Sequence, residues 1–317
     1  MTRSAVTVST IDRPPHRRRA SRTAWLTIAA FLLPALLLYA VFVLVPVVQA
    51  AYYSLFKWNG LQPLTDFIGL RNYQLALSNG VFQTSIANNF LIIALSLTIQ
   101  IPFSLGLAVL LNRRFPGRAL FRLVFFLPYV LSETITGIVF RLMLQPGSLV
   151  DAGLGSVGLG SLARDWLGDS TLVMFTVFVI ISWKYFGFHM IILLAGLQGI
   201  PRELEEAALI DGADRRQAFR YVTLPLLGPT IRLSVFLSMI GALQLFDMVW
   251  VMTGGGPLNA SSTIAIAMFK AGFKSTQMGY GSAIAVILFV LGLVVALAYQ
   301  RFVLRRDVDG ALTTTAG

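Results

Sequence analysis

The stretch that decides how this chain folds reads QGIPRELEEAALIDGADRRQAFRYVTLPLLG and occupies residues 198–228. It is polar and charged, whereas the stretches on both sides of it are long and largely apolar. Pro201 suits the first turn of a helix, where its missing N–H costs nothing. Gly212 suits the position after a helix where the backbone needs a positive φ. The sequence therefore predicts a short helix between Pro201 and Gly212, followed by a second one.

The second short helix carries its own start and stop signals. Asp214 is predicted to cap its N-terminus, with Gln217 three residues later as the partner in a capping box. Pro225 is predicted to end it, because the residue before a proline disfavours the helical conformation. Residues 198–228 are therefore predicted to form a pair of helices.

The first short helix is acidic at its start and has small side chains on its apolar face. Its glutamates lie near the positive end of the helix dipole. A helix lying on lipid would instead carry basic and large apolar side chains, whereas alanine lets the backbone of another protein approach closely. Docking to a cytoplasmic protein is therefore favoured over docking to lipid. The residues concerned are Glu203, Leu204, Glu205, Glu206, Ala207 and Ala208.

The composition of the whole chain excludes an ordinary soluble enzyme. Of the 317 residues, 56% are hydrophobic and only 12% are charged, against about 25% charged in soluble domains. Apolar runs of roughly 20 residues predict spanning helices, whereas a membrane β-barrel would show short alternating segments. We predict an all-α integral membrane protein with six transmembrane helices. These spans lie near residues 26–50, 86–111, 120–142, 171–197, 229–252 and 280–303.

The basic residues set the predicted topology. Arg and Lys gather in residues 1–24, in the loop 112–122, in residues 198–232 and at the C-terminus. The positive-inside rule places these segments, and so both termini, in the cytoplasm. We predict a cytoplasmic tail over 1–24, a transmembrane domain over 25–305 and a cytoplasmic tail over 306–317. Because topology explains most of the +11 net charge, no nucleic-acid partner is expected.

The helical pair contains a motif with fixed spacing. Glu206-Ala207-Ala208, three residues, Gly212, nine residues and then Val222-Thr223-Leu224-Pro225 resembles the EAA loop of permease subunits of binding-protein-dependent ABC importers, which usually have isoleucine at the position of Val222. The segments 67–73 (FIGLRNY), 126–128 (FLP) and 253–257 (TGGGP) resemble the carbohydrate-uptake branch. Their order is similar to that in the maltose- and glycerol-3-phosphate-type first permease subunit, and the likeness covers residues 25–305.

The resemblance implies a type I ABC importer permease fold in which the EAA helices are coupling helices that dock in a cleft of an ATPase. Glu206 would pair with a group of the ATPase, and Ala207 and Ala208 would allow a close fit. Gly212 would form the turn between the helices, and Leu224 and Pro225 would pack the loop against the permease's own spans.

The resemblance also implies the partners. They are a second homologous permease subunit, two ATPase subunits and an extracytoplasmic solute-binding protein, in the plasma (inner) membrane of a bacterium or archaeon. ATP and magnesium would bind to the ATPase, and this chain would bind no cofactor and catalyse no reaction. The sequence agrees, because no G-x-x-x-x-G-K-[ST] phosphate-binding loop occurs in it. The absence of Cys and the presence of only two His also disfavour a metal site.

Ionisable residues within the predicted spans are expensive and usually face the bundle interior or water. Lys184 is either a structural, internally paired lysine or part of the translocation pathway, beside Tyr185 and Phe188. His189 is interpreted as a satisfied core histidine and Glu133 as a structural polar contact.

Span five carries a stripe of small and polar residues. Ser234, Ser238, Gly241 and Gln244 are spaced by 4, 3 and 3 residues, which keeps them on one helix face. Such a stripe serves helix packing or lines a hydrophilic pathway, and the resemblance favours the pathway. Asp247 would meet the solute, form an outer gate or pair with Lys184. The predicted pathway residues are Lys184, Tyr185, Phe188, Ser238, Gly241, Gln244 and Asp247.

Two glycine-rich segments lie outside the predicted spans. Gly254, Gly255, Gly256 and Pro257 predict a tight turn that closes spans five and six, and by resemblance this turn also docks the binding protein. Residues 153–158 match G-x-G-x-x-G, but the strand and helix of a dinucleotide site are not expected around them. We interpret them as a flexible outer loop.

Two other classes of membrane protein remain as alternatives. An ion-coupled secondary transporter would use intramembrane carboxylates and often shows inverted repeats, whereas only Glu133 and Asp247 are available and no repeat is obvious. A membrane enzyme would have only Lys184, His189 and Asp247 for its chemistry. The importer permease is the function that the sequence favours.

Overall fold

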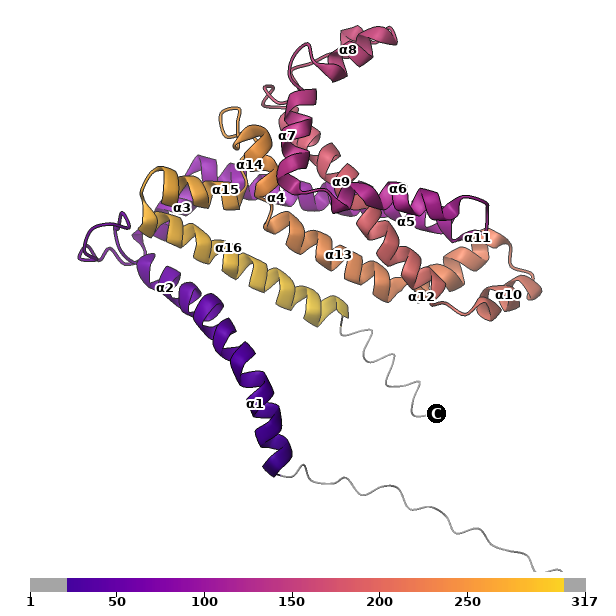
Figure 1. The fold of residues 1–317 in the computed structure, drawn as a ribbon, viewed down its shortest axis with the longest axis horizontal. Coiled ribbons are helices and arrows are strands. Elements are labelled where there is room, and N and C mark those ends of the chain that lie inside the picture. The colour runs from indigo at the N-terminus through magenta and orange to yellow at the C-terminus, as the bar shows by residue number, and fades with distance from the viewer. Residues whose placement is uncertain (1–21, 305–317) are drawn as a thin grey trace, which may run out of the picture. The chain divides into compact units, whose positions relative to one another are not determined.

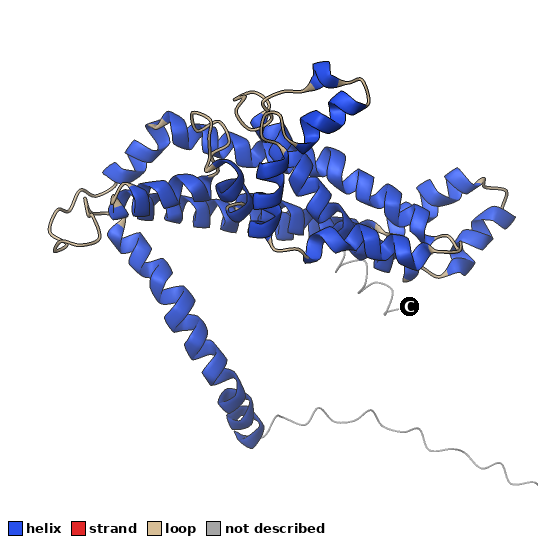
Figure 2. Ribbon diagram, turned by 45° about the horizontal axis from the view of Figure 1, so that its top comes forward, coloured by secondary structure: helices blue, strands red, loops and turns tan. Residues whose placement is uncertain are grey.

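The structure, a computed structural model, describes residues 22–304, and the regular elements in this range are helices (Figure 2). One isolated β-bridge joins Phe56 and Phe67. The all-α prediction is confirmed for this range. Residues 1–21 of the predicted N-terminal tail and the whole predicted tail 306–317 lie outside the described residues.

The chain forms two compact units, residues 1–49 and 50–317. The described part of the first unit is one apolar helix, α1 Arg22–Tyr39 with η1 Ala40–Leu44, which continues into α2 Val45–Tyr53. Most of its described side chains are exposed, as Phe31 (81%) and Phe42 (73%) show. Such an apolar surface needs lipid or another chain to cover it.

The second unit contains the remaining helices (Figure 1). Its first half holds α3 Arg71–Ser78, α4 Gly80–Leu95, η2 Ser96–Gln100, α5 Ile101–Asn112, α6 Arg118–Val130, α7 Glu133–Met143, α8 Leu149–Ser156 and η3 Gly160–Leu162. Its second half holds α9 Val173–Gln198, α10 Arg202–Ile210, α11 Arg215–Ala218, η4 Phe219–Thr223, α12 Leu224–Leu226, α13 Gly228–Leu243, α14 Asp247–Thr253, α15 Ile264–Phe269, η5 Lys270–Lys274, α16 Met278–Tyr299 and η6 Gln300–Leu304. Residues 153–158, predicted as a flexible outer loop, thus include the last turn of α8.

Four described helical stretches are long and apolar enough to cross a membrane without a break: Ala30–Tyr53, Gly80–Asn112, Val173–Gln198 and Met278–Val303. Two further candidates are broken. Arg118–Val130 meets Glu133–Met143 at 93°, and Arg215–Leu226 meets Gly228–Leu243 at 62°. By length and composition the structure therefore holds four spans, or up to six if each bent pair is one span.

The prediction of continuous helices over 120–142 and 229–252 is wrong. The first breaks at Leu131 and Ser132, whose backbones are extended, and the buried amine of Lys184 binds the Leu131 carbonyl that the break leaves free. The second ends at Leu243, and α14 begins only at Asp247. Both breaks lie within largely apolar sequence, so hydropathy alone does not predict them.

Three prolines within the described helices follow π-helical turns. Pro46, Pro102 and Pro225 each stand two residues after a π segment, namely η1, η2 and η4. A proline lacks an N–H, and its ring crowds the carbonyl four residues earlier. The wider π-helical turn, with hydrogen bonds from residue i to residue i−5, moves that carbonyl away. One such bond runs from Leu224 N–H to the Phe219 carbonyl. The helix predicted to end before Pro225 therefore continues to Leu226.

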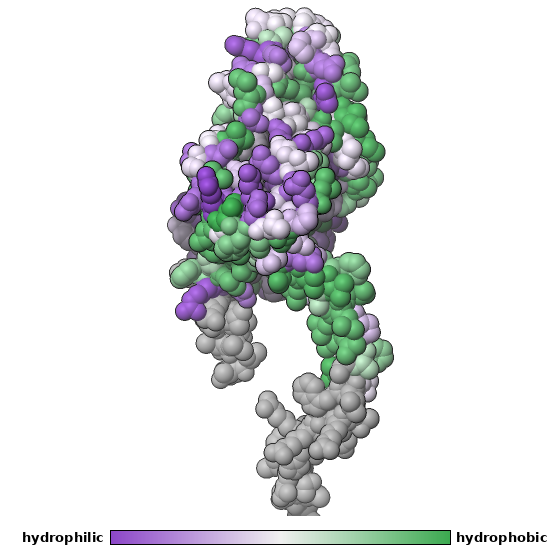
Figure 3. Space-filling view, turned by 90° about the vertical axis from the view of Figure 1, so that its left-hand side faces the viewer, coloured by the Kyte–Doolittle hydropathy of each residue, from purple (hydrophilic) through white to green (hydrophobic). Residues whose placement is uncertain are grey.

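Helix α9 is the centre of the second unit. It packs against α5 and α6, and α14 packs against α7 (Figure 1). A close approach is at Gly187 of α9, where an added Cβ would lie 1.9 Å from the Phe125 carbonyl oxygen of α6. Figure 3 shows hydrophilic residues gathered on the end formed by the loop 54–70 and α3, with apolar residues covering much of the rest of that view.

Candidate functional site

A cavity of about 310 Å³ lies where four helical stretches meet in the second unit. We call it the central cavity. Its lining comes from α4 and η2 (Ile92, Ser96, Gln100), from α7 (Glu133), from α9 (Ile181, Tyr185, Phe188, His189), and from α13 and the break after it (Leu237, Ser238, Gly241, Ala242, Gln244, Leu245, Phe246, Asp247).

The break between α13 and α14 shapes one wall of the central cavity. Buried polar side chains bind the carbonyls that the break leaves free: Asn89 Nδ2 donates to the Ala242 carbonyl at 2.6 Å, and Thr263 Oγ1 donates to the Leu245 carbonyl at 2.7 Å. Irregular backbone within a membrane protein is tolerated only where it is paired or lines a cavity. Here it does both.

The structure brings six of the seven predicted pathway residues together. Four come from predicted span five and its end, and two come from α9: Ser238, Gly241, Gln244, Asp247, Tyr185 and Phe188. Their contact with a solute stays a prediction. Ser234, at the start of the same stripe, is buried and lies 2.7 Å from His189 Nδ1. The stripe therefore serves packing at one end and lines the central cavity at the other.

Lys184 is the predicted pathway residue that does not line the central cavity. Its side chain is 2% exposed, and its amine donates to the carbonyls of Pro128 and Tyr129, both at 3.4 Å, and of Leu131. These carbonyls are at the end of α6, where a helix lacks internal donors and its dipole favours a cation. The geometry fits the structural alternative for Lys184.

Replacing Lys184 with methionine is expected to destabilise the protein, because the carbonyls at the end of α6 would lose their donor. An unpaired buried polar group costs about 1–3 kcal/mol, so the thermal unfolding temperature in detergent should fall clearly. The matched control is Lys274→Met, since Lys274 is exposed. An unchanged unfolding temperature for Lys184→Met would contradict this role.

Two carboxylates line the central cavity. Tyr185 donates its phenolic hydrogen to Glu133, and Asp247 is exposed at the start of α14. No Lys or Arg occurs among the described residues that line this cavity. Glu133, interpreted from the sequence only as a structural contact, thus also contributes negative charge to the lining.

Three polar lining residues were not predicted to belong to the pathway: Ser96, Gln100 and His189, the last of which was interpreted as a satisfied core histidine and does pair with Ser234. A signal was present for two of them. Asn89, Ser96, Gln100 and Ser104 are spaced by 7, 4 and 4 residues, which is one helix face. The periodicity that identified the stripe of span five would have found this one in span two.

The two short helices of residues 198–228 are present as α10 and α11. Asp214 Oδ1 accepts from Arg216 N at 2.7 Å and Gln217 N at 2.8 Å, and Gln217 Oε1 accepts from Asp214 N at 2.7 Å. The predicted capping box is confirmed. Gly212 has a φ of 91°, as predicted, and Pro201 precedes α10 as its N-cap residue.

The predicted coupling residues lie mostly on the surface. Glu206, Ala207, Gly212 and Pro225 are exposed, whereas Ala208 and Leu224 are half-buried. Glu205 and Glu206 line a second cavity of about 760 Å³, which also includes Arg113, Arg215 and Arg216. The surface is open to a partner, and its contact with an ATPase stays a prediction.

The outer glycine segment forms the predicted tight turn, but it leads into α15 and not directly into span six. Gly254 (φ 59°) ends α14, and Gly255 (φ 85°) is buried, where an added Cβ would lie 3.0 Å from Ile266 Cγ2. Thr253 Oγ1 and Ser261 Oγ, 2.8 Å apart, close the turn, which includes the cis bond between Gly256 and Pro257. Docking of a binding protein here stays a prediction.

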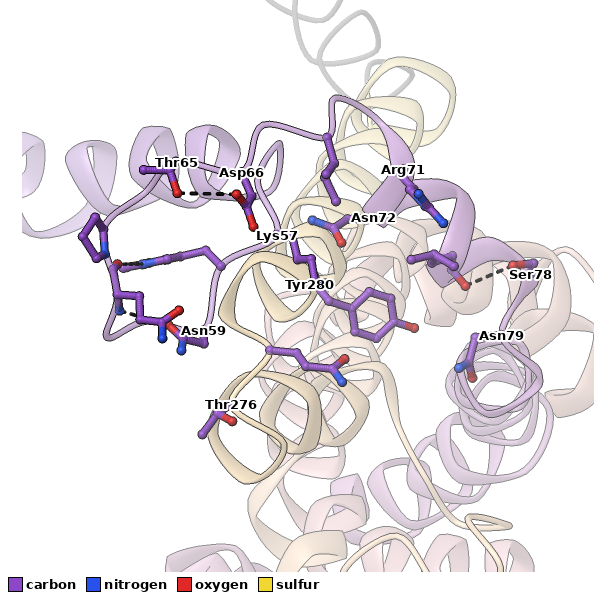
Figure 4. A pocket seen from close by; sticks show the side chains of 16 residues that line it. Lys57, Asn59, Thr65, Asp66, Arg71, Asn72, Ser78, Asn79, Thr276 and Tyr280 are labelled. Atoms are coloured by element: carbon purple, nitrogen blue, oxygen red, sulfur yellow. Dashed lines mark hydrogen bonds between the residues drawn. The ribbon is translucent and has the colours of Figure 1, made fainter.

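A third cavity, of about 890 Å³, lies between the loop 54–70, α3 and the start of α16 (Figure 4). Asn72 Nδ2 donates to the carbonyls of Ser54 and Phe56 at 2.8 and 2.9 Å. Ile68 N donates to the Leu55 carbonyl at 2.9 Å. These contacts give the motif at 67–73 a structural role in folding the loop.

Within residues 22–304, no three His, Cys, Asp or Glu side chains could hold a metal ion together.

Comparison with known proteins identifies the class. Residues 100–308 match the family described as the binding-protein-dependent transport system inner membrane component. The chain belongs to this family and is a multi-pass inner membrane protein.

Individual relatives agree with the family. The chain is 38% identical to a probable ABC transporter permease protein of Pyrococcus horikoshii, over 86% of this chain and 94% of that one. It is 35% identical to the multiple sugar-binding transport system permease protein MsmF of Streptococcus mutans, over 82% of this chain and 89% of that one. The resemblance to permeases of carbohydrate-uptake ABC importers is confirmed.

Solved structures share the fold. A chain from a bacterial ABC transporter involved in the import of the acidic polysaccharide alginate has a TM-score of 0.78 at 24% identity, over 90% of this chain and 96% of that one. A bacterial alginate ABC transporter in complex with an alginate pentasaccharide-bound periplasmic protein gives a TM-score of 0.76 at 22% identity, over 88% and 94%. This chain therefore shares its fold with these chains of ABC transporters.

Proposed function

We propose that this chain is a transmembrane permease subunit of an ATP-driven importer. With a second homologous permease subunit it forms the pathway for a sugar or sugar-like solute, which an extracytoplasmic binding protein delivers. Two ATPase subunits, docked at α10 and α11, supply the energy and hold ATP and magnesium. The observation that carries the proposal is the central cavity, whose polar and aromatic lining includes the start of α7 and the break between α13 and α14.

The lining of the central cavity suits a sugar. Tyr185 and Phe188 offer aromatic faces, and Ser238 and Gln244 offer hydrogen-bonding groups, which is the combination that binds a sugar ring and its hydroxyls. The names of the relatives support a carbohydrate solute, since one belongs to a multiple sugar-binding system.

The charges of the lining favour an uncharged solute. Glu133 and Asp247 are both acidic. The amine of Lys184 donates to the carbonyl oxygens of Pro128 and Tyr129 in α6 and of Leu131 in the bend before α7. A carboxylated or phosphorylated sugar would meet like charges in the lining. We therefore propose a neutral sugar, in contrast to the acidic polysaccharide that the alginate importer carries.

The exposed face of α10 supports the coupling role. Its acidic and small residues leave room for a close protein contact, and the chain has no phosphate-binding loop of its own. The positive-inside rule places α10, α11 and both termini in the cytoplasm. Closure of the ATPase would then move the spans through residues 200–225.

Replacing Gln244 with leucine is expected to weaken uptake without disrupting assembly, because it removes one hydrogen-bonding group from the lining. Loss of one such bond corresponds to about 1 kcal/mol, so the apparent affinity for the transported sugar should fall roughly fivefold. The control is Gln74→Leu on α3, an exposed glutamine outside the central cavity. If neither the apparent affinity for the sugar nor the rate of uptake changed, the stripe of span five would serve helix packing and not the pathway.

The proposed function is tested by uptake of labelled neutral sugars into cells with and without this chain. We expect uptake that needs the chain, stops when ATP is depleted and persists when an ionophore collapses the ion gradients at constant ATP. Uptake that survives ATP depletion and is abolished by the ionophore would support the ion-coupled secondary transporter and contradict the proposal.

A further inference from the structure

Gln100 is a buried glutamine with an unused hydrogen-bond donor. It is 3% exposed, lies in η2 between α4 and α5, and lines the central cavity. Its Nε2 is buried and has no hydrogen-bond partner. Among the described residues the same holds for Arg122 Nε and Ser182 Oγ, but neither residue lines the central cavity.

The other buried polar residues of this helical stretch show what a packing role looks like. Asn88 Nδ2 donates to the carbonyls of Ala260 and Ser262, both at 2.8 Å. Asn89 donates to Ala242 and accepts from Ile264 N at 2.9 Å. Ser104 donates to the Phe186 carbonyl at 3.0 Å. Each of these joins two elements, whereas the amide of Gln100 joins none. Helix packing therefore does not account for Gln100.

The backbone holds Gln100 in place at the central cavity. The π-helical turn closes with Ile101 N donating to the Ser96 carbonyl, and the Gln100 carbonyl accepts from Ser104 Oγ at 2.8 Å. This wider turn places Ser96 and Gln100 together in the lining. Single π-helical turns inside α-helices are frequent at functional sites.

The neighbouring groups of the lining limit what Gln100 can bind. His189 Nδ1 is paired with Ser234 Oγ at 2.7 Å, which fixes the imidazole ring, and Glu133 is paired with Tyr185. An amide N–H needs an acceptor oxygen. The carboxylates in the lining disfavour an anionic acceptor, so a hydroxyl oxygen is the acceptor that fits the charges.

We propose that Gln100 is a solute-contacting residue that sets specificity by donating a hydrogen bond from its amide to a sugar hydroxyl. This inference rests on the proposed function. A site with a buried donor discriminates strongly against an analogue that lacks the matching group, because the donor is then left unpaired. Gln100 would thus select for one hydroxyl of a neutral sugar.

The test measures initial uptake rates against sugar concentration in cells that carry the chain or its variants. The probes are labelled maltose, trehalose and cellobiose, followed by singly deoxygenated analogues of whichever is transported. We expect Gln100→Leu to raise the apparent KM roughly tenfold with little change in the maximal rate. We also expect the variant to lose sensitivity to the removal of one hydroxyl to which the unaltered protein is sensitive.

Two measurements separate a solute contact from a structural role. Thr98→Val is the matched control, because Thr98 lies in the same π-helical turn but is exposed. The apparent KM for sugar uptake should not change in this variant. The thermal unfolding temperature of Gln100→Leu in detergent should be unchanged or higher, since the variant removes an unpaired buried amide.

Two outcomes would overturn the inference. One is an unchanged KM for Gln100→Leu, and the other is a raised KM that accompanies a lower unfolding temperature and equal sensitivity to every deoxy analogue. Failure of the unaltered protein to take up any labelled neutral sugar would instead overturn the proposed function.

Discussion

Replacing Glu206 with lysine is expected to reduce uptake at least about 30-fold while the chain stays folded in the membrane. Glu206 is exposed on α10 and lies in the segment proposed to dock on the ATPase. Reversing the charge at a buried contact between proteins costs about 2 kcal/mol or more, and the transport step would lose its energy source. Uptake in cells and the amount of chain in the membrane fraction are the two measurements.

The matched control for this prediction is Glu203→Lys. Glu203 belongs to the same helix and is also exposed, but it does not line the cavity that includes Glu205 and Glu206. The control variant should keep most of its uptake. Normal uptake by the Glu206→Lys variant would refute the assignment of α10 as a coupling helix.

Replacing Gly187 with alanine is expected to destabilise the protein by about 3 kcal/mol, the upper range for overpacking. The new Cβ would lie 1.9 Å from the Phe125 carbonyl oxygen and 3.1 Å from Phe126 Cα. Because these are backbone atoms, α6 and α9 would have to separate. Tyr185 and Phe188, which line the central cavity, flank Gly187 on α9, so uptake should fall together with thermal stability in detergent.

Gly106→Ala is the control for the close approach at Gly187. Gly106 lies in α5, and an added Cβ there would meet nothing within 4 Å. Alanine also favours a helix over glycine by about 1 kcal/mol, so this variant should be as stable as the unaltered protein or slightly more so. Equal stability of the two variants would show that α6 and α9 are not in contact at Gly187.

The sequence predicted the parts of the fold that depend on local chemistry. The capping box at Asp214 and Gln217 and the turn at Gly212 are set by residues within a few positions of each other, and both are present. The breaks at Leu131–Ser132 and at Gln244–Phe246 were missed. They depend on partners far along the chain, such as Lys184 for the first and Asn89 for the second.

The candidate site was predicted only where one helix carried the whole pattern. Ser238, Gly241 and Gln244 share a face of one helix and line one cavity. The sequence left both a structural role and a pathway role open for Lys184, because its partners are backbone carbonyls of another helix. No sequence pattern indicates which carbonyls lack a hydrogen-bond donor. Gln100 lies on a periodic polar face of span two that the sequence does show, but only the contacts in the structure distinguish it from the packing residues Asn89 and Ser104.

The most direct test of the central claim is site-specific photocross-linking from Ala207 in native membranes, with the captured protein identified by mass spectrometry. Ala207 is exposed on α10, next to Glu206. The account predicts that the captured protein is an ATPase subunit with a phosphate-binding loop, and that a probe at Gly153 captures none. Capture of no ATPase from Ala207, in membranes where the chain still supports uptake, would contradict the account.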